Sequence, residues 1–210
     1  MRRSVFERAG AWARALYVSM GIVWLGHTAA ATEVTQPIEQ LDTGLLQAMK
    51  AGKTAPFRQR YDQLAPLVTR AVDLDFILQS GVGAGWAGLP ADQKAALKAA
   101  FQHYSVATYV SNFDAFGGER FDLFPPAGTD PVVKVKIMPG KPGDDIHTLA
   151  YTMRQTADGW KATDVRADGT ISQVAAQQEQ IRSLVKSGGA AGLLARLQEK
   201  TAELSGGTVH

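Results

Sequence analysis

The sequence predicts one α+β domain, in which a twisted four-stranded antiparallel sheet is covered by about six helices. Three observations lead to this prediction. Apolar residues recur at helical spacing before residue 117 and again after residue 170. Between these segments, four short runs alternate apolar and polar residues, as strands do, and turn residues separate them. The turns are too short to hold a crossover helix, so neighbouring strands run antiparallel, and helices and strands are segregated along the chain.

The first thirty-one residues have the pattern of a secretory signal peptide. Several arginines precede an uncharged apolar run at residues 15–25, and small residues follow at 28–31. The apolar run is about half of the roughly 20 residues that a membrane-spanning helix needs. We expect cleavage after Ala30 or Ala31, which leaves a single domain over residues 32–204 and a frayed tail at 205–210. An uncleaved N-terminal anchor is the alternative.

Four helices are expected before the sheet. Apolar spacing places the first over residues 36–51, and Thr54 is a suitable N-cap for the second. A short third helix begins at Asp73. The longest helix is predicted over residues 91–116, where it carries an aromatic stripe and is stopped by two glycines.

The sheet and the final helices complete the domain. The predicted strands cover residues 120–124, 132–138, 146–155 and 160–167. Strict alternation on the last strand would put Trp160 and Ala162 on one face and Val165 on the other. Two helices are expected after the sheet, over residues 171–186 and 190–204, with a Ser-Gly-Gly segment between them.

Composition and residue spacing disfavour several functional classes. The net charge is only +2 and the chain has no cysteine, which argues against nucleic-acid binding and against a thiol nucleophile. The few histidines lack the spacing of a zinc site. Close acidic pairs fall mostly at expected helix starts or turns, where aspartate caps or turns the chain. These pairs are Asp73 with Asp75, Asp144 with Asp145, and Asp164 with Asp168. We expect no enzyme activity, no metal and no cofactor.

Residues 83–88 read GAGWAG, which is a literal G-x-G-x-x-G. A dinucleotide-binding fingerprint follows a strand, opens directly into a helix and has an acidic residue about 20 positions further on. Here a predicted helix comes before the glycines, and Pro90 and a separate helix come after them. We therefore interpret the segment as a flexible connector.

What remains is a large supply of apolar side chains on the long helix and on one face of the strands. These side chains can form a solid core, which is the interpretation that the residues alone favour. They can also line a cleft between the sheet and the helices, as in many small-molecule sites. Composition does not decide between the two.

Short motifs, taken in order, resemble the MlaC family, also called toluene-tolerance or ABC-transporter auxiliary proteins. The matching residues are Asp75-Phe76, Gly83, Trp86, Pro90, Gln93, Phe101, Thr108-Tyr109, Tyr151, Gly159-Trp160-Lys161, Asp164-Val165, Gly169, Gly188-Gly189 and Leu193-Leu194. The resemblance covers nearly all of the mature chain. Where the phospholipid carriers usually have Arg-Tyr, this chain has Ala84-Gly85. The segments AGWAGLP and DGTISQVA look closer to the hopanoid-biosynthesis-associated (HpnM-like) branch.

The resemblance implies a soluble periplasmic protein that encloses a lipid in an apolar cavity. It would shuttle this lipid, a hopanoid or a phospholipid, between membranes as part of an ABC-transporter or exporter system. The partners would be the inner-membrane transporter or exporter and an outer-membrane donor complex, with no nucleic acid, and the protein would be a monomer. A ligand-free interaction module of a membrane complex is the alternative. The predicted lipid contacts are Trp86, Phe101, Tyr104, Tyr109, Phe113, Val135, Ile137, Tyr151, Met153 and Trp160.

Overall fold

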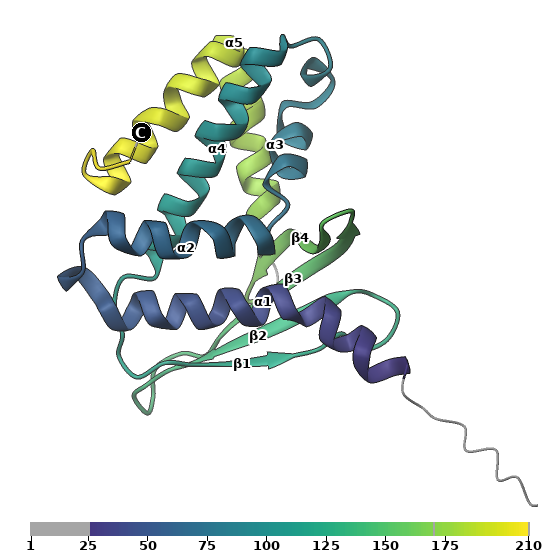
Figure 1. The fold of residues 1–210 in the computed structure, drawn as a ribbon, viewed down its shortest axis with the longest axis vertical. Coiled ribbons are helices and arrows are strands. Elements are labelled where there is room, and N and C mark those ends of the chain that lie inside the picture. The colour runs from purple at the N-terminus through teal and green to yellow at the C-terminus, as the bar shows by residue number, and fades with distance from the viewer. Residues whose placement is uncertain (1–25, 170, 210) are drawn as a thin grey trace, which may run out of the picture.

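The computed structural model describes residues 26–169 and 171–209 and has an α+β architecture (Figure 1). The α-helices are α1 (Gly26–Ala51), α2 (Phe57–Ala71), α3 (Leu74–Val82), α4 (Ala91–Asn112) and α5 (Gln173–Ser205). Short 3₁₀ helices cover Gly52–Thr54 and Gly83–Trp86. The strands are β1 (Arg120–Phe124), β2 (Val132–Met138), β3 (His147–Thr156), β4 (Gly159–Ala167) and β5 (Ile171–Ser172). They form one antiparallel sheet in the order β1-β2-β3-β4-β5.

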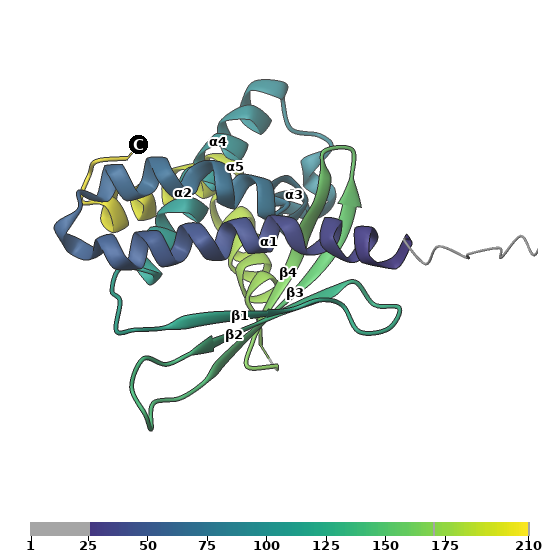
Figure 2. The same ribbon diagram turned by 60° about the horizontal axis from the view of Figure 1, so that its bottom comes forward.

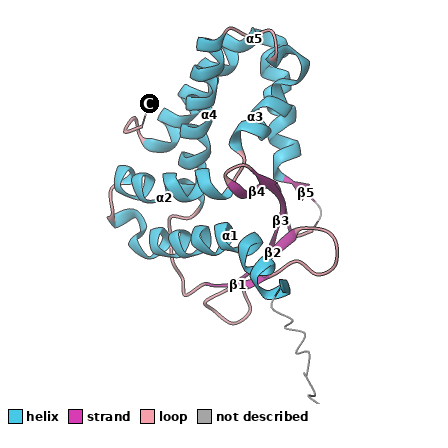
Figure 3. Cartoon of the chain, turned by 45° about the vertical axis from the view of Figure 1, so that its right-hand side comes forward, coloured by secondary structure: helices cyan, strands magenta, loops and turns pink. Residues whose placement is uncertain are grey.

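The predicted counts of strands and helices need correction. The sheet has a fifth strand, because the chain after the turn at Asp168 pairs two more residues, Ile171 and Ser172, with the end of β4. The two helices expected at the C-terminus are one element, α5, which folds back on itself (Figure 3). The break falls at Gly189, where φ is 62° and ψ is −163°, a conformation that is essentially restricted to glycine. The chain therefore reverses at a single residue, and not over the expected Ser-Gly-Gly segment.

Two further helix ends differ from the prediction. Helix α4 stops at Asn112 rather than at residue 116, because Phe113 leaves the helical conformation and its ring packs edge-on against Phe121 of β1. Helix α1 begins at Gly26, so the expected cleavage point lies within its first turns. Residues 1–25 of the predicted signal peptide lie outside the described residues.

A β-bulge changes which residues of β4 face the core. Tyr151 is paired with Val165 and Met153 with Ala162, so one extra residue, Thr163, is accommodated on β4. The Thr163 hydroxyl donates to the carbonyl of Thr152, 3.2 Å away. Because directly paired residues share a face, Ala162 and Val165 both face the core, and the prediction that they lie on opposite faces was wrong.

The elements form a sheet layer and two groups of helices. Helices α1 and α2 lie over one face of the sheet, and α3, α4 and α5 form a second group beside them, in which α3 and α5 contact β4 (Figures 1 and 2). Their apolar faces meet in a core whose largest fully buried side chains come from every layer. These include Tyr151, Phe101, Ile38, Leu41, Leu64, Leu78 and Leu193. No helix in the described ranges is long and apolar enough to span a membrane.

The chain end packs where the sequence predicts fraying. Gly206 adopts a left-handed conformation and its N–H bonds to the carbonyl of Ala202. The backbone N–H of Val209 donates to the Ser205 hydroxyl, 3.2 Å away. Val209 is 2 % exposed, so residues 205–209 form a compact turn against the helices.

Candidate ligand-binding site

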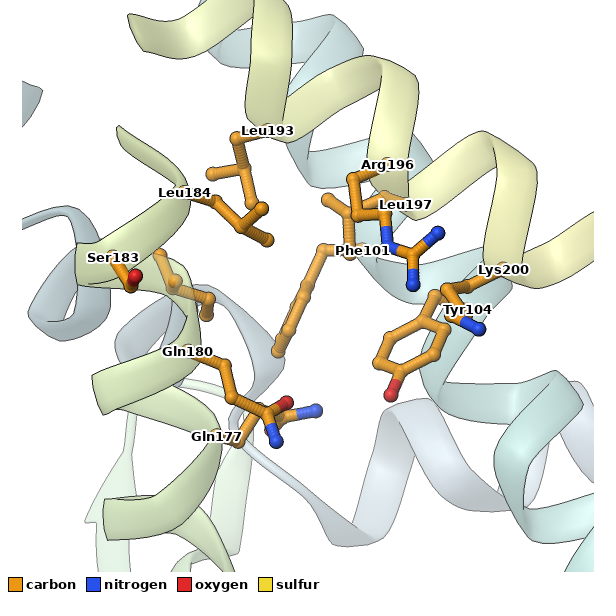
Figure 4. A pocket seen from close by; sticks show the side chains of 11 residues that line it. Phe101, Tyr104, Gln177, Gln180, Ser183, Leu184, Leu193, Arg196, Leu197 and Lys200 are labelled. Atoms are coloured by element: carbon orange, nitrogen blue, oxygen red, sulfur yellow. The ribbon is translucent and has the colours of Figure 1, made fainter. Parts of the chain in front are cut away.

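A hollow of about 490 Å³ lies between α4 and the two limbs of α5 (Figure 4). We call residues 173–188 the first limb of α5 and residues 190–205 the second. The apolar lining consists of Phe101, Ile181, Leu184, Leu193 and Leu197. The polar lining consists of Tyr104, Gln177, Gln180, Ser183, Arg196 and Lys200. The site therefore has the amphipathic lining that small-molecule pockets commonly show.

The hollow follows from helical spacing and from the break at Gly189. Ile181 and Leu184 are three residues apart and so share one face of the first limb, while Leu193 and Leu197 share a face of the second. The reversal at Gly189 turns these faces toward each other. Figure 4 shows Phe101 of α4 projecting between them. Each face is apolar by ordinary helical periodicity, but the hollow exists only because the two limbs are brought together.

The charged residues of the lining are both cations from the second limb. Arg196 donates to the exposed Glu199, with 2.6 Å between Nη1 and Oε2, and Lys200 pairs with Glu203. The side chains of Arg196 and Lys200 are 40 % and 37 % exposed. Neither glutamate is among the residues that line the hollow, so the charged groups of the lining itself are cations, and their carboxylate partners belong to the neighbouring surface of the helix.

Of the ten residues that the sequence predicts as lipid contacts, Phe101 and Tyr104 line this hollow. The others lie elsewhere. Val135, Tyr151 and Met153 are buried in the core on the inner face of the sheet. Ile137 borders a second hollow of about 440 Å³, whose lining includes Glu119, Asp144 and Asp145. The sequence reasoning missed the α5 residues, although their apolar spacing on either side of two glycines is a signal for a helical hairpin.

The remaining predicted contacts pack against the core from several directions. Tyr109 and Phe113 stack with their ring centroids 6.2 Å apart, and Phe113 meets Phe121 edge-on at the same distance. Trp86 and Trp160 are half-buried against the core. Their contact with a lipid stays a prediction.

A small group of buried polar side chains lies in this core. Burial, reinforced by Glu39, raises the pKa of Asp42 from 3.8 to about 7. Burial also raises the pKa of Tyr109 to about 12, and that of Tyr151 well above 10, with Asp42 a further cause in both cases. Among the described residues, the Asp42 Oδ1 and the Tyr151 hydroxyl have no hydrogen-bond partner. The core between the sheet and the helices therefore contains buried polar atoms that lack hydrogen-bond partners, which is uncommon in proteins.

Other candidate chemistry has structural explanations. Asp73 caps α3 by accepting from the N–H of Phe76, and Asp168 accepts from the N–H of Thr148 at a strand end. Within the described residues, no group of three or more His, Cys, Asp or Glu side chains is arranged to hold a metal ion. The GAGWAG segment lies between α3 and α4 and begins with a 3₁₀ helix, which confirms that no strand precedes it.

Comparison with known proteins gives one family and one fold. The family described as MlaC protein matches residues 39–199. A solved structure of a phospholipid-binding protein from Ralstonia solanacearum, in complex with a phospholipid, is similar with a TM-score of 0.67 and 18 % sequence identity. The similarity covers 84 % of this chain and 98 % of that one, and at this identity it establishes the shared fold. No curated protein matches the sequence.

Proposed function

Because the chain belongs to the MlaC family, we propose that it binds a lipid and carries it between membranes through the periplasm. The observation that carries this proposal is the hollow between α4 and α5, which joins an apolar floor to a polar rim. The phospholipid bound by the Ralstonia protein of the same fold supports the same class of ligand. In the proposed system the chain works beside an ABC transporter or exporter of the inner membrane and an outer-membrane donor.

The physical task of such a carrier is to shield apolar surface from water. At roughly 25 cal/mol per Å² of buried apolar area, covering an acyl chain or a polycyclic skeleton supplies several kcal/mol of binding free energy. This task needs a shaped apolar surface and no catalytic group. We infer that the protein is a binding protein rather than an enzyme, in line with the structural roles of its aspartates.

We propose that Phe101 and Tyr104 contact the lipid in the hollow without any change in the conformation described above. Predicted contacts in the core between the layers, such as Phe113 and Tyr151, would be reached only when the sheet parts from the helices. Two features support movements that admit a lipid. The buried Asp42 lacks a full set of hydrogen bonds in the core, which favours parting of the sheet from the helices. Gly189 provides a point about which the α5 limbs can spread to widen the hollow itself.

For the identity of the lipid, we propose a hopanoid or a phospholipid. The segments AGWAGLP and DGTISQVA support the hopanoid-associated branch, whereas the bound ligand of the Ralstonia protein supports a phospholipid. Export through the predicted signal peptide would place the protein in the periplasm, where a monomeric carrier can exchange lipid with both membranes.

The test is to purify the protein from the periplasm of a hopanoid-producing bacterium and identify the co-purified lipid by solvent extraction and mass spectrometry. The purified protein is then mixed with fluorescent-lipid donor vesicles and unlabelled acceptor vesicles. We expect about one lipid per protein and faster transfer between vesicles. Protein that is always empty and that accelerates no transfer would refute the proposal and favour a ligand-free interaction module.

A further inference from the structure

The mouth of the hollow between α4 and α5 is charged on one side only. Arg196 and Lys200 are four residues apart, so both side chains emerge from the same face of the second limb. Figure 4 shows them beside the Tyr104 ring, across the hollow from the amides of Gln177 and Gln180. None of the residues that line the hollow is a carboxylate. The mouth therefore offers hydrogen-bond donors and two positive charges above an apolar floor.

The glutamates that pair with these cations are not part of the lining. Glu199 and Glu203 belong to the exposed surface of α5, with side chains 56 % and 49 % exposed. Exposed ion pairs of this i,i+3 kind contribute little to stability, since water screens them and both side chains lose conformational freedom. An anion in a partly desolvated mouth would be bound more strongly, because the apolar lining lowers the local dielectric constant. A ligand can therefore recruit Arg196 and Lys200 at small cost.

We propose that the hollow selects amphiphiles whose polar end is anionic, a carboxylate or a phosphate. The anionic group lies between Arg196 and Lys200, and the apolar chain lies on the floor formed by Phe101, Leu184 and Leu197. Arginine suits either head, because its planar guanidinium can donate two parallel hydrogen bonds to a carboxylate or a phosphate. This inference rests on the proposed lipid-binding function and adds the charge of the ligand to it.

The experiment compares ligands that share one chain and differ in the head. Oleate, oleoyl lysophosphatidate and oleyl alcohol each displace a fluorescent lipid probe from the full-length mature protein at pH 8. The test variant carries Arg196→Gln and Lys200→Gln together, and the matched control carries Arg182→Gln alone. Arg182 lies on the first limb, also has a glutamate three residues away, and does not line the hollow.

We expect both anions to bind the wild type about tenfold or more tightly than oleyl alcohol does, as charge-assisted hydrogen bonds predict. The double variant should lose this preference while keeping its affinity for oleyl alcohol, and Arg182→Gln should behave as the wild type. The ratio of oleate to lysophosphatidate affinity identifies the preferred head. Equal affinity for the anions and the alcohol, or a preference that survives in the double variant, would overturn the inference and leave lipid binding intact. Failure of the fluorescent lipid probe and of all three ligands to bind would overturn both.

Discussion

Arg154 of β3 and Asp73 at the start of α3 form an ion pair, with 2.6 Å between Nη2 and Oδ2. The Asp73 side chain is only 12 % exposed, and its other oxygen caps α3 through the N–H of Phe76. The Arg154 guanidinium also lies 4.1 Å from the centre of the Phe76 ring. A single carboxylate thus starts a helix and fastens that helix to the sheet.

Substitution Asp73→Ala should therefore remove a cap and an ion pair together. We expect the free energy of unfolding to fall by about 1–3 kcal/mol, measured by urea denaturation. The control is Asp75→Ala, which removes an exposed carboxylate that pairs with Lys98 and should change stability by less than about 1 kcal/mol. A double-mutant cycle with Arg154→Ala should show coupling. Strict additivity would contradict the ion pair.

Asp42 should make stability depend on pH near neutrality. Its pKa in the folded protein is raised to about 7, so the folded state keeps a proton that the unfolded state releases near pH 4. The free energy of unfolding should therefore fall as pH rises from about 4 to 7 and level off above that. The full loss is at most about 4 kcal/mol, from roughly 1.4 kcal/mol per pH unit.

The check is urea denaturation of the wild type and Asp42→Asn at several pH values. The amide does not titrate, so the free energy of unfolding of the variant should rise steadily relative to that of the wild type between pH 4 and 7. Asp144→Asn removes a carboxyl from an exposed turn and serves as the control. Parallel profiles for the wild type and Asp42→Asn would show that the buried carboxyl does not titrate in this range.

Gly189 should be far less tolerant of a side chain than its neighbour Gly188. A Cβ at either position meets no atom within 4 Å, but only Gly189 has a positive φ. Gly189→Ala should cost about 1–3 kcal/mol through backbone strain and lower lipid loading by disturbing the α5 hairpin. Gly188→Ala should leave both quantities nearly unchanged. Equal effects of the two substitutions would mean that the conformation at Gly189 is not what shapes the hollow.

Phe113 tests whether lipid also reaches the layer between the sheet and the helices. It is half-buried between Tyr109 and Phe121, and Phe113→Glu should reduce lipid loading severalfold in protein that still gives a folded circular dichroism spectrum. Phe116→Glu is the control, because Phe116 is 42 % exposed and lies against Lys50 instead. Normal loading of Phe113→Glu would confine the lipid to the hollow between α4 and α5.

Local patterns were sufficient to predict most of the elements, because helix caps and hairpin turns depend on a few neighbouring residues. The cap at Asp73 and the tight turn before β4 are examples. The bulge at Thr163 was missed because strict alternation was assumed. Apolar residues at Ala162 and Val165, three positions apart in a strand, were a usable sign of it. The edge of β4 at Ala162 also pairs with Val72, a contact between distant segments that no local pattern contains.

The site was harder to predict than the fold. Phe101 and Tyr104 line the hollow and were predicted as lipid contacts from the family resemblance, whereas the aromatic stripe of their helix alone favoured a solid core. The facing residues Leu184 and Leu197 lie in the two helices expected after the sheet, where the sequence predicted no site. They line the hollow because Gly189 reverses the chain, and the direction of a reversal depends on a backbone angle that residue types alone do not determine.

Native mass spectrometry of two neighbouring variants tests the central claim, that the hollow between α4 and α5 holds the lipid. Leu184 lines the hollow, whereas Val185, also half-buried, does not. The account predicts that wild-type protein and Val185→Glu retain one bound lipid after purification and that Leu184→Glu, although folded, is empty. A folded Leu184→Glu protein that carries as much lipid as the wild type would contradict it.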